Sequence, residues 1–342
     1  MIATSQKKAK TMKNPNILKQ LIKDRTLVLD GAMGTMIQKY KFSEEDYRGN
    51  RFSDYNVLLK GNNDLLSLTQ PKSILNIHRE YLEAGADIIM TNTFSSTSIA
   101  MADYNMESLV YELNYESAKL AKKAISEFDS IQKPRFIAGS IGPTNKTASM
   151  SPDVNNPGFR EVQFDDLVAS YFEQVSALFD GGVDILFVET VFDTLNAKAA
   201  LYAIQDFNIK NSVDIPIMLS GTLTDASGRT LSGQTLEAFM TSVSHINLIS
   251  IGLNCSFGAK GLFPHIKKMS MISKIPISAH PNAGLPNEFG EYDQSPEQMK
   301  ILMKDYLDIN LVSIIGGCCG TTPDHIKNIA EIISSYNLKK QG

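Results

Sequence analysis

The sequence predicts a (β/α)8 TIM barrel formed by a single domain. Eight short apolar segments alternate with helical patterns along the 342 residues, which is the order of elements in such a barrel. The links from helix to strand are short, whereas the links from strand to helix are long. An open, doubly wound sheet is the alternative architecture, and the count of eight favours the barrel.

The predicted strands are continuous apolar runs rather than alternating ones, as expected for parallel strands that are buried on both faces. They are TLVLD (26–30), ADIIMTNT (86–93), FIAGS (136–140), DILFVE (184–189), PIMLSG (216–221), LISIGLNC (248–255), PISAHP (276–281) and LVSIIGG (311–317). None of these segments contains a lysine. A barrel aldolase that uses a Schiff-base lysine is therefore not expected.

The segment 164–179 carries the clearest helical pattern, with apolar residues at i, i+3, i+4 and i+7. Glycines in LEAGAD (82–87) and FDGGVD (179–184) end helices just before the next strand. Long polar or glycine-rich loops instead follow the strands, over 30–71, 142–163, 222–234 and 280–295. Because these loops all follow carboxyl ends of strands, that face of the barrel is predicted to be the active one.

Composition excludes several classes of partner. The formal charge of −4 gives no general attraction to nucleic acid or to anionic membranes, and no apolar run approaches the ~18 residues of a membrane span. We assign residues 1–24 to an N-terminal arm and the start of a first helix near 17–23, and residues 25–342 to the barrel. The first residues lack the apolar core of a secretory signal. With three cysteines in the chain, a reducing cytoplasmic setting is expected.

The three cysteines all lie at predicted strand ends: Cys255 is the last residue of the sixth strand, and Cys318 and Cys319 directly follow the eighth. Strand ends share one rim of a barrel, so the sulfurs are expected to converge. Three thiolates with one open position are typical of a catalytic zinc. A vicinal disulfide or buried apolar thiols are the alternatives.

Neighbouring residues in a regular strand point to opposite faces. The glycines around the pair, Gly316, Gly317 and Gly320, are expected to bend the backbone so that both sulfurs face inward. The segment 321–324 resembles a capping box that would start the next helix.

Two carboxylates are predicted at the same rim. Asp30 ends the first strand and precedes a loop of small residues whose backbone N–H groups suit an anion, and Glu189 ends the fourth strand. They could act as general acid and base, or hold a free amino acid. Alternatively, Asp30 caps its own loop. His280, at the end of the seventh strand, is expected to be a hydrogen-bonded structural residue.

Ten stretches together resemble the homocysteine S-methyltransferase family, and within it the homocysteine-binding module of cobalamin-dependent methionine synthase. They are LDGAMGTMIQ, KGNNDLL, YLEAGADII, TNTFSSTSIAMADY, GPTNKTASMSPDV, ETVFDTLNAKAA, SGTLTDASGRTLSGQT, GLNCSFGA, AHPNAGLPNEFGEYD and GGCCGTTPDHI. The resemblance covers nearly the whole chain from Leu27. One departure is Met90, where relatives in this branch often have an acidic residue.

The resemblance implies a zinc site and a substrate site. It implies that Cys255, Cys318 and Cys319 bind zinc and act in catalysis through it, with Asn282 as a candidate fourth ligand in the resting state. It also implies that the amino acid end of homocysteine is held by Asp30, Gly31, Ala32 and Glu189. Zinc-bound homocysteine would then attack a methyl group to give methionine.

The methyl donor implied by the resemblance is methylcobalamin carried by a separate domain or protein, because nothing in the chain resembles the folate, cobalamin or reactivation modules. The chain would then be an excised fragment or a stand-alone protein with a corrinoid-carrying partner. Betaine or S-methylmethionine as donor, or a non-catalytic zinc-stabilised docking subunit, are the alternatives. We expect the segment 40–70 to move as a lid for a large donor.

Overall fold

The computed structural model describes residues 15–224 and 227–341, and their strands form one parallel sheet with the order β1-β8-β7-β6-β5-β4-β3-β2. The strands are β1 (Leu27–Val28), β2 (Ile88–Met90), β3 (Phe136–Ile141), β4 (Ile185–Val191), β5 (Ile217–Gly221), β6 (Ser250–Gly258), β7 (Ile277–Asn282) and β8 (Ile314–Ile315). Each lies within or overlaps a predicted segment, so the prediction of eight strands is confirmed.

The sheet closes between its first and last strands in this order, β1 and β2. An isolated parallel bridge joins Leu29 to Ile88. Backbone N–H groups of Asp30 and Asp87 donate to the carbonyls of Ile88 and Val28, at 3.0 and 2.7 Å respectively. These contacts complete a (β/α)8 barrel, as the sequence predicted.

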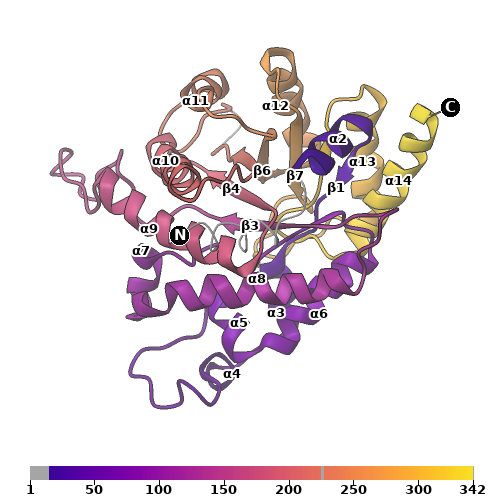
Figure 1. Ribbon diagram of the computed structural model, residues 1–342. Helices are drawn as coiled ribbons and strands as arrows, with labels where there is room; N and C mark the ends of the chain where they lie inside the picture. Colours follow the sequence, from indigo (N-terminus) through magenta and orange to yellow (C-terminus); the bar gives the residue numbers. More distant parts are fainter. Residues whose placement is uncertain (1–14, 225–226, 342) are drawn as a thin grey trace.

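Helices surround the strands (Figure 1). They are α2 (Pro15–Asp24), α3 (Met33–Tyr40), α4 (Glu44–Arg48), α5 (Leu66–Thr69), α6 (Pro71–Glu83), α7 (Ser98–Met101), α8 (Val110–Ser126), α9 (Phe164–Gly181), α10 (Thr194–Asn211), α11 (Leu236–Val243), α12 (Ala259–Ile272), α13 (Pro296–Asp308) and α14 (Pro323–Gln341), with 3-10 turns η1 (Asn63–Leu65), η2 (Ala102–Tyr104) and η3 (Glu107–Leu109). In the two described ranges, no helix has the length and apolar character needed to cross a membrane.

The helix α9 shows why the predicted pattern folds as it does. Its apolar stripe is buried against the barrel and against α8 and α10. A capping box between Gln163 and Asp166 starts the helix, and Gly182 ends it in the left-handed conformation with φ 97°. Gly85 has φ 108° after α6 in the same way. Both glycines were predicted as helix stops, and both are confirmed.

The apolar core has two parts. A larger cluster lies between the strands and the helices around them, and a smaller one fills the barrel interior. Leu18 and Ile22 of α2 belong to the interior cluster, together with Leu27 of β1. Burial of a side chain of this size contributes about 1.5–3 kcal/mol to stability. The first helix therefore packs on the barrel; residues 1–14 of the expected arm lie outside the described residues.

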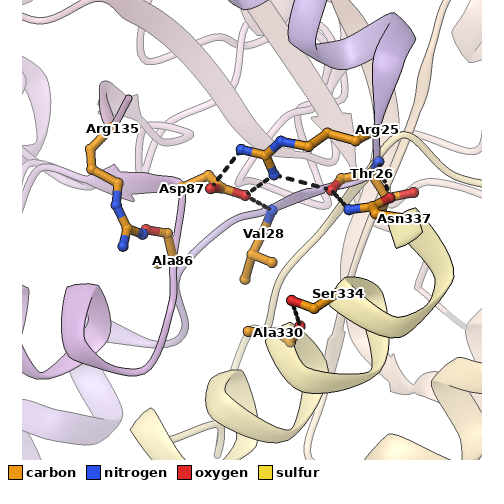
Figure 2. A network of polar contacts seen from close by, with 9 residues as sticks. All are labelled: Arg25, Thr26, Val28, Ala86, Asp87, Arg135, Ala330, Ser334 and Asn337. Atoms are coloured by element: carbon orange, nitrogen blue, oxygen red, sulfur yellow. Dashed lines mark hydrogen bonds and ion pairs between the residues drawn. The ribbon is translucent and has the colours of Figure 1, made fainter. Parts of the chain in front are cut away.

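A polar network ties the amino-terminal ends of β1 and β2 together (Figure 2). The buried carboxylate of Asp87 accepts two hydrogen bonds from the guanidinium of Arg25, at 2.8 and 2.9 Å, and one from the N–H of Val28 at 2.9 Å. The side-chain amide of Asn337 in α14 bonds both backbone groups of Thr26. Because β1 and β2 are only two and three residues long, these side chains supply much of their attachment.

Candidate metal and substrate site

A cavity of about 860 Å³ opens at the carboxyl ends of the strands. This is the face that the long loops predicted to be active. Seven residues at or just beyond strand ends line the cavity: Asp30, Thr91, Ser140, Glu189, Asn254, His280 and Cys318. Gly61–Asp64, from the segment expected to act as a lid, line it as well. Whether that segment moves stays a prediction.

The three cysteines converge on this cavity as free thiols. Their sulfur atoms all lie within 4.8 Å of one another, and the sulfurs of Cys255 and Cys319 are 3.8 Å apart. A disulfide bond requires about 2.05 Å, so these sulfurs are not bonded to each other. The predicted convergence is confirmed.

Unusual backbone angles turn the sulfur of Cys255 toward the others. Cys255 and Ser256 both have left-handed φ values, 61° and 60°. The pairing of β6 with β7 shifts register at this point, between Asn254 and Gly258. Such conformations cost non-glycine residues about 1–3 kcal/mol each and occur preferentially at functional sites. The sequence did not predict this turn, because no glycine marks it.

The glycines beside Cys318 and Cys319 act in two ways. Unusual dihedrals were expected at Gly316, Gly317 and Gly320, and of these three only Gly320 has a left-handed φ, of 79°. Gly317 is needed for space instead, since a Cβ there would lie 2.4 Å from the Thr321 hydroxyl oxygen. Both effects keep the pair of cysteines on a tight turn after β8.

The three thiols shift one another's pKa through hydrogen bonds. Hydrogen bonds from Cys318 and Cys319 lower the pKa of Cys255, while the same contacts with Cys255 raise the pKa of Cys318 and of Cys319. The sulfurs thus compete for negative charge. Three thiolates this close are stable together when a cation lies among them, so the cluster has the character of a cation site.

β7 carries two buried polar side chains at its carboxyl end, Asn282 and His280. Asn282 contacts Cys255 with a hydrogen bond that lowers the pKa of the thiol, and its Oδ1 atom has no partner among the described residues. His280 packs edge-on against Phe187, with 5.5 Å between ring centroids. Burial lowers the pKa of His280 to about 3, so its ring is neutral. The Nε2 atom of His280 has no partner in the described structure; the expectation of a hydrogen-bonded histidine is not met at this atom.

Asp30 and Glu189 form a second charged region of the cavity. Asp30 accepts a hydrogen bond from the N–H of Met90 at 2.9 Å, and its Oδ1 atom is buried without a partner among the described residues. Burial raises the pKa of Asp30 well above its usual value, and repulsion from Glu189 raises the pKa of Asp30 further. Burial also raises the pKa of Glu189, to about 7. Two buried carboxylates, one of which raises the pKa of the other, favour a bound cation.

The predicted loop residues Gly31 and Ala32 line the same cavity, at the amino terminus of α3. The N-cap residue Ala32 offers no side-chain cap to this helix. A Cβ on Gly34 would meet no atom within 4 Å, so open space lies beside this first turn. Helix amino termini favour anions such as carboxylates.

Thr321 joins the first loop to the cysteine turn, a role that sequence reasoning missed. Its hydroxyl donates to the carbonyl of Cys318 at 2.6 Å and accepts from the N–H of Ala32 at 3.1 Å. The hydroxyl of Tyr81 lies 3.1 Å from the carbonyl oxygen of Ala32. The predicted capping box at 321–324 is therefore wrong by one residue: Thr322 and His325 form the cap of α14.

The chain is similar to known proteins in both sequence and fold. The sequence matches the family Homocysteine S-methyltransferase over residues 27–333. The crystal structure of the homocysteine methyltransferase MmuM from Escherichia coli in its oxidised form is similar to the chain with a TM-score of 0.72 and 21% identity, over 94% of this chain and 100% of that one. Its metallated form gives 0.70 and 22%, over 93% and 100%.

A more distant likeness is to a B12-independent methionine synthase from Shewanella sp. W3-18-1 in complex with selenomethionine. Its TM-score is 0.53 and its identity 11%, over 92% of this chain and 99% of that one. At these identities the structural likenesses show a shared barrel fold.

Proposed function

The chain belongs to the homocysteine S-methyltransferase family, and we propose that it methylates homocysteine with the help of zinc held by Cys255, Cys318 and Cys319. Membership of this family makes the chain a methyltransferase rather than a docking subunit, and homocysteine is the substrate of the family. The observation that carries the proposal is the convergence of three thiols with two buried carboxylates in one cavity.

The thiol cluster fits zinc. Tetrahedral zinc with Zn–S bonds of about 2.3 Å separates its sulfur ligands by about 3.8 Å, which is the distance between the sulfurs of Cys255 and Cys319. Soft sulfur donors favour zinc over magnesium or calcium. The unpartnered Oδ1 atom of Asn282 supports this residue as the fourth ligand in the resting state. When bound, zinc would keep the homocysteine sulfur deprotonated, and therefore nucleophilic, at neutral pH.

The carboxylates and the first loop suit the other end of the substrate. Asp30 and Glu189 would bind the ammonium group, because a cation relieves the repulsion between two buried carboxylates. Gly31, Ala32 and the first turn of α3 would receive the carboxylate through backbone N–H groups. The residues at both ends would thereby orient the homocysteine sulfur toward the donor.

The proposed donor is methylcobalamin supplied by a separate domain or protein. The cavity of about 860 Å³ is far larger than homocysteine requires, which leaves room for a donor above the sulfurs. The stretches MSPDV (150–154) and TDASGRTLSGQ (224–234) support the cobalamin-dependent branch in particular. A corrinoid-carrying partner is part of this proposal.

A small cationic donor is the second candidate. Asp64 and Asp103 line the same cavity, and the pKa of Asp64, raised to about 6 by burial, leaves it ionised at neutral pH. Betaine and S-methylmethionine both carry their methyl groups on a positively charged atom, which acidic side chains attract.

A donor screen tests the proposal. Zinc-loaded protein is incubated with homocysteine and free methylcobalamin, betaine or S-methylmethionine, and methionine is measured. We expect methionine from methylcobalamin, its loss after zinc is removed by a chelator, and its recovery on re-addition of zinc. Cys318→Ser should lower zinc content and methionine formation together. Full activity in metal-free protein would contradict the role of zinc, and activity with betaine or S-methylmethionine alone would replace the proposed donor.

A further inference from the structure

Asn254 makes four hydrogen bonds at the centre of the site. It directly precedes Cys255 in β6 and is 2% exposed. Its Oδ1 atom accepts from the N–H of Thr190 at 3.0 Å and from the hydroxyl of Ser220 at 2.5 Å. Its Nδ2 atom donates to the Thr190 hydroxyl at 2.8 Å and to the Cys318 sulfur at 3.8 Å. The side-chain amide is therefore fully satisfied.

The orientation of this amide follows from its contacts. The backbone N–H of Thr190 is a donor and cannot accept. The atom of Asn254 that faces it must therefore be the oxygen, and the NH₂ group must face Cys318. An N–H group aimed at a sulfur stabilises the thiolate form, because hydrogen bonds to a charged acceptor are the strong ones.

Thr190 continues the contact toward Glu189, the carboxylate proposed to bind the ammonium group of the substrate. It follows Glu189 directly and has a left-handed φ of 56°. Its hydroxyl accepts from Asn254, so its own proton is free to bond the carboxylate of Glu189, a contact that lowers the pKa of that group. The hydroxyl of Ser140 donates to the same carboxylate at 2.5 Å. A continuous chain of hydrogen bonds thus runs from the Cys318 sulfur to Glu189.

We propose that Asn254 is a positioning residue that holds the Cys318 sulfur and the Glu189 carboxylate in one fixed relationship. Homocysteine is short, so its sulfur and ammonium ends bind together only when the thiol cluster and the carboxylate are correctly spaced. Asn254 sets this spacing through Thr190 and also withdraws electron density from the sulfur. The inference rests on the proposed function, because that function assigns the thiol cluster to the metal and the Glu189 carboxylate to the substrate.

Asn254 has two arms: its contact with the Cys318 sulfur, and its contacts through Thr190 toward Glu189. Three variants separate them. Asn254→Asp keeps an acceptor for the Thr190 N–H but removes the side-chain N–H that faces the sulfur. Asn254→Ser removes the same side-chain N–H without adding a charge. Thr190→Ala breaks the arm toward Glu189 and leaves the contact with Cys318. Ser220→Ala is the matched control, because it removes one bond to the same Oδ1 atom and touches neither arm.

The first readout is the sulfur-to-metal charge-transfer absorption of Co(II)-substituted protein. We expect the band to move to longer wavelength in both Asn254 variants and to stay in place in Thr190→Ala and Ser220→Ala. The second readout is the affinity for norvaline, which has the amino acid end of homocysteine without its thiol. We expect Thr190→Ala to weaken norvaline binding about tenfold, which is the effect of losing one hydrogen bond to a charged group. Ser220→Ala should leave the affinity for norvaline unchanged.

The outcomes distinguish this inference from the proposed function. If the wild-type protein binds no Co(II) through sulfur, the proposed function fails. If the wild-type band is present and both Asn254 variants keep it unshifted, the proposed function stands and the role of Asn254 is overturned. The same holds if Ser220→Ala shifts the band as far as Asn254→Asp does, since the effect would then reflect packing alone.

Discussion

The backbone N–H of Ala32 donates to the hydroxyl of Thr321 at 3.1 Å, across 289 residues of sequence. The same hydroxyl donates to the carbonyl of Cys318, so one side chain joins the substrate loop to the cysteine turn. Thr321→Val keeps the shape but leaves both backbone groups without this partner, at a cost of about 1–3 kcal/mol. We expect a lower Tm and weaker binding of both zinc and norvaline.

Thr321→Ser is the control for this prediction, because it retains the hydroxyl and loses only a methyl group. Its zinc and norvaline affinities should stay close to those of the wild type. Equal behaviour of the valine and wild-type proteins in both titrations would show that the hydroxyl does not couple the two loops.

Glu189→Gln should separate substrate binding from metal binding. The amide still accepts the hydrogen bond from Ser140 but carries no charge for the ammonium group. Loss of a charge-assisted hydrogen bond weakens homocysteine binding by about 10- to 100-fold. Metal analysis should show unchanged zinc content, and calorimetry should show the loss of affinity. Wild-type affinity in this variant would argue against an ammonium site at Glu189.

The affinity for norvaline should depend on pH through the carboxyl group of Glu189. Burial raises the pKa of Glu189 to about 7, so at pH 6 about a tenth of the carboxyl groups are ionised and norvaline should bind about tenfold more weakly than at high pH. The buried carboxyl of Asp30, whose pKa is also raised, acts in the same direction. In Glu189→Gln the pH dependence should flatten, and a steep dependence that survives this change would exclude Glu189 as its source.

The stability of the ligand-free protein should change with pH in the opposite sense. The folded pKa of Glu189 lies above its usual value of 4.5, so the folded state binds this proton more tightly than the unfolded state does. The stabilisation from this proton is fully present below pH 4.5 and is lost as the pH rises through about 7. Comparing unfolding of wild type and Glu189→Gln between pH 5 and 8 measures the difference.

Asp87→Asn tests the network at the opposite end of the barrel (Figure 2). Breaking a buried ion pair by removing one charge costs about 3–5 kcal/mol, and here Arg25 loses its carboxylate. We expect a large fall in the free energy of unfolding with unchanged zinc and norvaline affinities. The exposed pair between Arg51 and Glu112 offers the control: Glu112→Gln should cost about 0–1 kcal/mol. Equal losses in the two variants would contradict a structural role for the network.

The strands and the active face could be predicted because they depend on local sequence. Buried parallel strands are apolar runs, and loop length distinguishes the two ends of the barrel. The convergence of Cys255 with Cys318 and Cys319 then follows from topology, because β6 and β8 both flank β7. These predictions needed no knowledge of side-chain contacts.

The remaining features arise from contacts between distant segments. Cys255 and Ser256 adopt left-handed φ values although neither is a glycine, so the residue types do not signal the turn. Asn254 contacts Thr190, 64 residues away, and its only signal in the sequence is its place in the GLNC motif. The cap of α14 shifts to Thr322 because the Thr321 hydroxyl is already bonded to Cys318. Local patterns contain no information about such long-range bonds.

X-ray absorption at the zinc edge, recorded without and with homocysteine, tests the assignment of metal, substrate and open ligand position together. Without homocysteine, we expect zinc bound by three sulfurs and one lighter atom, in agreement with Cys255, Cys318, Cys319 and the candidate ligand Asn282. With homocysteine, a fourth sulfur should replace the lighter atom. A zinc spectrum that homocysteine leaves unchanged, or a metal bound without three sulfurs, would contradict the assignment.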